Sequence, residues 1–136
     1  MGKAEVIAPL ARRLTREVLW APAGVVLLHW TAGALFGHEP YVDPVMHFSG
    51  GVAVAYASRH AVTVGIDVFG RLTPLAADLC AFGATSAAAV LWEIGEYASD
   101  QLIHTNVQLS LDNTMRDLIL GVSGAAVFLL VRRFAR

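Results

Sequence analysis

The sequence has few charged residues, a single cysteine and none of the short motifs that mark common nucleotide-binding or nucleophilic enzymes. Charged residues make up 15% of its 136 positions, whereas hydrophobic residues make up 56%. With a mean hydropathy of +0.57, this composition is typical of a membrane protein and excludes an ordinary soluble domain. As the only cysteine, Cys80 can form neither an internal disulfide nor a thiolate metal site. The formal net charge of −1, without a basic patch, indicates no nucleic-acid partner.

Four apolar segments predict four membrane-spanning helices, at residues 18–37, 44–64, 74–97 and 113–131. A helix needs roughly 20 residues to cross a hydrocarbon core of about 30 Å, so the chain has room for one such domain over residues 1–136. Before the first span, four apolar residues recur at three- and four-residue spacing beside arginines, which predicts an amphipathic helix on the membrane surface; they are Ile7, Leu10, Leu14 and Val18. The predicted fold is therefore all-α: a polytopic, antiparallel bundle of four transmembrane helices with an N-terminal interfacial helix.

The charges divide between the two ends of these spans. Nine of the ten lysines and arginines fall on one side, which the positive-inside rule makes cytoplasmic, together with both termini. Two short loops, around residues 37–44 and 98–112, then face outward. Most acids gather toward the outward side against Arg116 alone; they are Glu39, Asp43, Glu93, Glu96, Asp100, Asp112 and Asp117. We therefore expect Arg116 to bind a substrate phosphate or to pair within this acidic group.

Two of these acids are expected to lie below the outer surface. The charge-free stretches 79–92 and 118–131 are about 21 Å long as helices, which is too short for a hydrocarbon core of about 30 Å. Glu93 and Asp117, which follow and precede these stretches, must then be submerged. Ionisable groups at that depth cost about 2.5 to 3.5 kcal/mol each and usually face the interior with partners.

Three pairs of polar residues lie three or four positions apart, and so share a helix face, at the outer ends of three spans. The pairs are Asp43 with His47, Glu93 with Glu96, and Asn113 with Asp117. A dry cluster of carboxylates cannot stay fully ionised, so it either holds protons or binds a cation. Carboxylates with an imidazole suit Zn, Mn or Fe(II), and Mg would use carboxylates alone. The predicted ligands of a divalent metal are Asp43, His47, Glu93, Glu96 and Asp117, and the predicted catalytic residues are Glu93 and Glu96. A purely structural hydrogen-bonded network is the alternative.

The strings YVDPVMHFSGG, LWEIGEY and LDNTMRDLILG resemble motifs of the YjdF-like family of bacterial inner-membrane proteins and, more distantly, of the VanZ-like proteins. The predicted ligands match the acids and the histidine of those motifs, whereas Asn113 stands where the last motif usually has an aspartate. The resemblance implies a compact intramembrane bundle in the bacterial cytoplasmic membrane with an acidic and histidine-containing site. It supplies no reaction.

Two classes of function fit these observations. The first is a membrane hydrolase or transferase that acts on lipid-linked or envelope substrates, with a metal-activated water and a glutamate as base. The second is a non-catalytic accessory subunit that packs within a larger membrane complex or homo-oligomer among the membrane lipids. Other polar residues have simpler interpretations: Asp112 is expected to be a helix cap, Glu39 and Asp100 solvated loop charges, and His29 a packing residue far from the acidic cluster.

Overall fold

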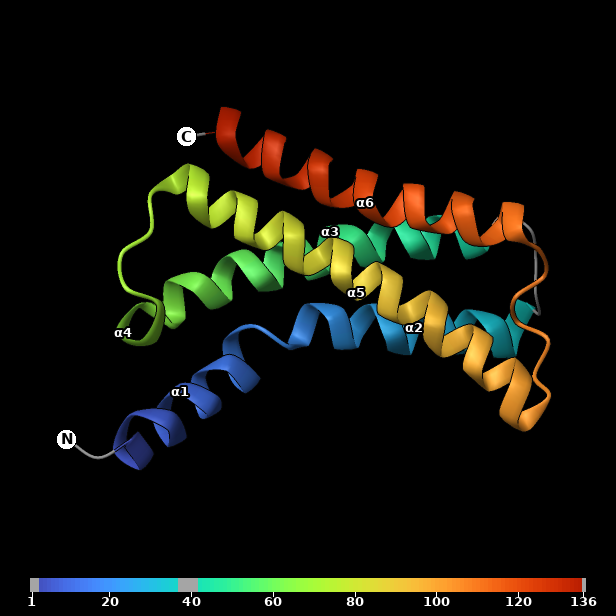
Figure 1. The fold of residues 1–136 in the computed structure, drawn as a ribbon, viewed down its shortest axis with the longest axis horizontal. Coiled ribbons are helices and arrows are strands. Elements are labelled where there is room, and N and C mark those ends of the chain that lie inside the picture. Colours follow the sequence, from blue (N-terminus) through green and yellow to red (C-terminus); the bar gives the residue numbers. More distant parts are fainter. Residues whose placement is uncertain (1–2, 37–41, 136) are drawn as a thin grey trace.

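The protein is described by a computed structural model over residues 3–36 and 42–135, and all regular structure in those ranges is helical. Figure 1 shows α2 and α5 running in one direction and α3 and α6 in the opposite direction. The all-α prediction is thereby confirmed. The predicted loop around residues 37–44, with Glu39, lies largely outside the described residues. The helices are α1 (Lys3–Glu17), α2 (Trp20–Phe36), α3 (Val42–Val64), α4 (Ile66–Phe69), α5 (Pro74–Ile103) and α6 (Leu111–Phe134).

The helix starts follow ordinary capping chemistry. Thr73 caps α5, since its hydroxyl accepts from the amide of Ala76 at 3.2 Å, and Pro74 follows in the first turn. Ser110 caps α6 in the same way, which corrects the expectation that Asp112 is the cap. The α5 helix also continues six residues beyond the predicted end at 97, so the predicted outward loop is confined to residues 104–110.

Two helices, α5 and α6, are long and apolar enough to cross a membrane. A third crossing is possible if the segments Ile7–Glu17 and Trp20–Leu35, bent by 46° at a short break, form one span. Of the four predicted spans, 44–64 coincides with α3, which is long enough but not apolar enough to qualify by itself. Its position explains the difference, because α3 packs against each of the five other helices and so offers lipid little surface.

The apolar face of α1 is occupied by α3. Val18 is buried with Ala57 and Val64 of α3, and two further residues of the predicted stripe, Leu10 and Leu14, pack against this cluster. Most of the predicted apolar stripe therefore contacts protein. Its position at a membrane surface stays a prediction.

Glycines bring α3 and α6 together. A Cβ atom built on Gly51 would overlap the carbonyl oxygen of Gly121, and one built on Gly124 would overlap that of Phe48. Only a residue without a side chain allows two helix backbones to approach this closely. The contact lies one helical turn beyond His47 and Asp117, so it fixes the distance between the two helices at the level of the predicted site.

The four larger helices are not equivalent in their packing. The α3, α5 and α6 helices pack against one another pairwise. Within the described part of the chain, α2 packs along α3 and touches α1, but it does not pack along α5 or α6. The arrangement is therefore a three-helix core with α2 beside α3.

A buried ion cluster ties that core together at the end opposite the predicted site. Asp78 of α5 accepts from Arg59 Nε of α3 at 2.8 Å and from Arg132 Nη1 of α6 at 3.1 Å. Each helix of the core thus contributes one charge to the same contact.

Candidate metal site

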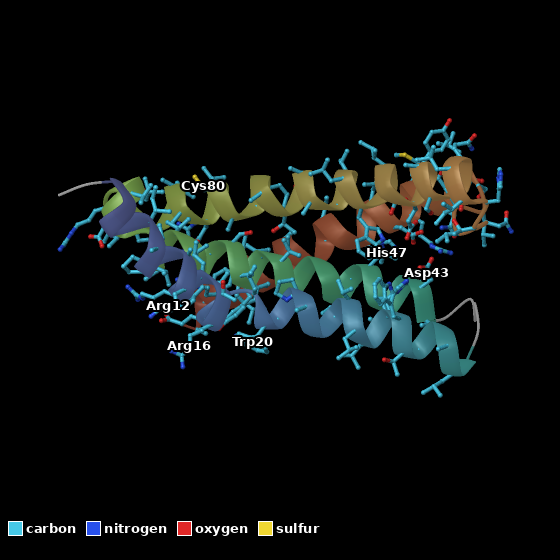
Figure 2. The ribbon with its side chains drawn as sticks, turned by 90° about the horizontal axis from the view of Figure 1, so that it is seen from below. Arg12, Arg16, Trp20, Asp43, His47 and Cys80 are labelled. Carbon is cyan, nitrogen blue, oxygen red and sulfur yellow. The ribbon has the colours of Figure 1, made fainter. Side chains whose placement is uncertain are left out.

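All five predicted ligands come together at one end of the helices. Asp43 and His47 lie in the first two turns of α3, and Asp117 lies in the second turn of α6, which runs parallel to α3. The α5 helix arrives from the opposite direction and brings Glu93 and Glu96 to the same level. Figure 2 shows Asp43 and His47 toward one end of the molecule, with Arg12, Arg16 and Cys80 toward the other.

His47 is the centre of the cluster. Its Nε2 atom lies 3.2 Å from Asp43 Oδ1 and 4.0 Å from Asp117 Oδ2, and its Nδ1 atom lies 3.7 Å from Glu93 Oε1. The side chain is only 10% exposed. The imidazole therefore stands between two groups of carboxylates, one on each of its nitrogen atoms.

The carboxylates on the Nε2 side are well satisfied. Asp117, which is 1% exposed, accepts from Asn113 Nδ2 at 2.5 Å and from Arg116 Nε at 3.1 Å. Arg116 also donates from Nη2 to Asp43 at 3.2 Å and to the Asn113 side-chain oxygen at 2.7 Å. The expectation that Arg116 pairs within the acidic group is thus met, since one guanidinium bridges two carboxylates. Binding of a substrate phosphate by Arg116 stays a prediction.

The carboxylates on the Nδ1 side of His47 lack hydrogen-bond donors for some of their oxygens. Glu93 is 5% exposed, and its Oε2 atom is the one buried side-chain oxygen in the described residues that lacks a hydrogen-bond partner. Glu96 accepts a hydrogen bond from Trp92 Nε1 at 2.7 Å, on its Oε1 atom. No arginine or lysine of the described residues pairs with either glutamate. A buried carboxylate oxygen without a donor is expensive, so this side needs a proton or a cation.

Two overlapping sets of atoms could hold a metal ion. They are Asp43 with His47 and Asp117, and His47 with Glu93 and Glu96; within each set the ligand atoms lie within 4.8 Å of one another. Ligands on opposite sides of an ion at about 2.1 Å would lie about 4.2 Å apart. Small side-chain movements would therefore bring the ligand atoms of either set within bonding distance of one ion. A neutral imidazole has one nitrogen free to bind a metal, so the two sets cannot both use His47.

Other residues that shape this end of the molecule were misjudged or missed in the sequence. Asp100, expected to be a solvated loop charge, accepts from the Thr105 hydroxyl and from the backbone amides of residues 106, 107 and 108 at 2.5–2.9 Å. It therefore holds the turn that leads into α6. Trp92 donates to Glu96 four residues along the same helix, and that spacing is a detectable signal for their hydrogen bond. His29 was expected to lie far from the cluster, but its ring meets that of Trp92 edge to face, with centroids 6.0 Å apart.

Residues 10–136 match a family described as "Predicted membrane protein (DUF2238)". The match spans nearly the whole chain, and the chain belongs to this family. No curated protein and no solved structure matches it. The interpretation of the sequence as a membrane protein is thereby confirmed, and the family description assigns no reaction.

Proposed function

We propose that this membrane protein binds one divalent cation between His47, Glu93 and Glu96 and uses it in a hydrolysis or group-transfer reaction. The observation that carries the proposal is the buried Oε2 atom of Glu93, which no donor reaches. A cluster that served only to join helices would be expected to satisfy its buried oxygens, as the Asp117 side does through Asn113 and Arg116.

The imidazole geometry supports the second of the two candidate sets, His47 with Glu93 and Glu96. His47 Nε2 lies 3.2 Å from Asp43, close enough to donate a hydrogen bond, which leaves Nδ1 as the nitrogen that can bind a metal. Nδ1 faces Glu93. A carboxylate that orients a metal-binding histidine through its other nitrogen is a recurring arrangement in metal sites. Asp43 and Asp117 then support the site, and Arg116 bridges both carboxylates and offsets one of their two negative charges.

Two carboxylates and one imidazole suit Zn, Mn or Fe(II), and Mg would rely on the carboxylates alone. Three protein ligands leave coordination positions open, which is the usual feature of a catalytic rather than a structural metal site. Such an ion polarises a carbonyl or phosphoryl oxygen and activates water. Glu93 and Glu96 are the carboxylates nearest to it and are the candidates for proton transfer.

The proposal extends to topology and family. The start of α1 and the end of α6 lie at the same end of the molecule, opposite the site (Figure 1). Most basic residues belong to the segments that the sequence places on this side of the spans. We therefore propose four crossings of the bacterial cytoplasmic membrane, with both termini in the cytoplasm and the site facing outward. The motifs around His47, Glu93 and Asp117 support kinship with YjdF-like proteins.

Metal analysis of the protein purified in mild detergent tests the proposed function. We expect about one divalent ion per chain, with a sharp loss in Glu93→Gln and Glu96→Gln. Asp43→Asn should weaken metal affinity by about 10–100-fold, because it removes the group that orients His47. Asp112→Asn is the matched control, since Asp112 is an exposed acid on α6 outside both candidate sets.

A wild-type protein with less than about a tenth of an ion per chain, after mild purification without chelators, would contradict the proposal. The cluster would then be a protonated, hydrogen-bonded network. In that case the protein is better explained as a non-catalytic subunit of a larger membrane assembly.

A further inference from the structure

An apolar slot adjoins the candidate metal site. It has a volume of about 150 Å³ and lies between α2, α3 and α5. Each helix lines it with residues at positions i, i+3, i+4 and i+7, so it runs parallel to the helices for about 10 Å. His47 and Trp92 lie at the end of the slot nearest the cluster, and Val54 and Thr85 lie at the other end.

Little in the slot can bind water. The lining residues with polar side-chain atoms are His29, His47, Thr85 and Trp92, and the Trp92 indole already donates to Glu96. The Thr85 hydroxyl donates to the Ala81 carbonyl at 2.8 Å, and one nitrogen of His47 is engaged by Asp43. A buried water needs two to four polar partners, which the middle of the slot does not provide. An empty slot would also forfeit dispersion contacts along its walls.

The opening of the slot indicates what fills it. In the part of the chain that the structure describes, α2 does not pack along α5, so the slot lies at the margin of the three-helix core. The α5 helix is one of the two that are apolar and long enough to span a membrane. The surroundings of this margin are then lipid, and hydrocarbon chains are the apolar molecules present there at high concentration.

We infer that one acyl chain of a membrane phospholipid occupies the slot between α2, α3 and α5, with its polar end at His47, Glu93 and Glu96. The inference rests on the proposed function and names its substrate class. A cavity of about 150 Å³ takes a group about the size of benzene, so it admits a segment of one chain and not two chains side by side. Because His47 lines both the slot and the cluster, a chain in the slot places the ester end of the lipid next to the proposed metal ligands.

Photochemical labelling tests the inference. The full-length protein is purified in mild detergent, mixed with phosphatidylglycerol that carries a diazirine on one acyl chain, irradiated, and digested for peptide mapping. We expect labelled positions on the slot-facing residues of α2, α3 and α5. Ala88→Leu places a larger side chain in the slot and should lower this labelling about tenfold, relative to labelling elsewhere on the protein. Ala87→Leu, on the exposed neighbouring position of α5, should leave it unchanged.

A second variant guards against misfolding. Val26→Phe fills the slot from α2, which lies outside the three-helix core, and should lower slot labelling as Ala88→Leu does. Labelling spread evenly over the apolar surface, or slot labelling unaffected by both variants, would overturn the inference. Labelling of the slot by a diazirine-bearing farnesyl phosphate but not by the phospholipid would overturn the choice of an acyl chain.

Metal content measured in the same samples separates the two proposals. Bound metal without slot labelling refutes the lipid inference and leaves the proposed function standing. Slot labelling without metal refutes the proposed function, and the lipid then has no reactive site beside it.

Discussion

Replacing Gly51 with alanine should force α3 and α6 apart. The new Cβ atom would overlap the carbonyl oxygen of Gly121 and lie 2.8 Å from its carbonyl carbon, whereas ordinary Cβ contacts are 3.4–4 Å. The atoms in the way belong to a helix backbone, which cannot rotate aside as a side chain can. The overlap with the oxygen is the larger of the two, so the helices must separate locally by roughly 1 Å or more.

The separation has a cost that can be approximated. Overpacking of a close contact costs about 1–3 kcal/mol, and the change from glycine to alanine in a helix returns about 0.5–1 kcal/mol. Because the overlap is with helix backbone, the cost lies at the upper end of that range, and we expect Gly51→Ala to lower the free energy of unfolding by about 2 kcal/mol. Because the contact lies one turn from His47 and Asp117, the variant should also weaken metal binding.

Thermal unfolding in one detergent, with metal analysis of the same samples, measures both effects. Gly83→Ala is the matched control, because an added Cβ at Gly83 meets nothing within 4 Å. It should keep only the gain in helix propensity and unfold at or above the wild-type temperature. The reasoning fails if Gly51→Ala is as stable as the wild type, or if Gly83→Ala loses as much stability as Gly51→Ala.

Two further predictions concern the opposite end of the molecule. Asp78→Asn should lower the free energy of unfolding by about 3 kcal/mol, because it leaves Arg59 and Arg132 without their shared carboxylate. Thermal unfolding measures this loss, with Asp67→Asn, at an exposed position, as the control. Equal stability of the two variants would show that the ion cluster contributes nothing. A reporter that is active only in the cytoplasm, fused after Arg136, should be active; activity only of an exported reporter would reverse the proposed orientation and place the site inside.

The grouping of the candidate ligands could be predicted from the sequence because it depends on local spacing and on length. Asp43 and His47 share a helix face at four-residue spacing, and Asn113 and Asp117 do the same, as their hydrogen bond shows. The shortness of the charge-free stretches then required Glu93 and Asp117 to be submerged. Both are buried in the structure.

Contacts between helices could not be predicted in this way. Nothing in the spacing of the glycines distinguishes Gly51, where an added Cβ would overlap α6, from Gly83, where an added Cβ would meet nothing within 4 Å. Asp100 looked like a solvated charge because its partners are backbone amides of the following turn, which carry no sequence signal. The polarity of α3 likewise depends on contacts between helices, since α3 packs against the five other helices.

The packing also explains why the polar clusters lie at both ends of the three-helix core. In the described residues, the buried apolar side chains are mainly alanines and valines, whereas many leucines and tryptophans are exposed. In a membrane those exposed residues contact lipid, so their burial cannot hold the helices together. Cohesion must come from close backbone packing, as at Gly51, and from polar contacts between helices, such as that of Asp78 with Arg59 at one end and that of Arg116 with Asp43 at the other. Because Arg116 of α6 already bonds to Asp43 of α3, the unpaired oxygen of Glu93 is not needed for cohesion, which favours its assignment to a ligand.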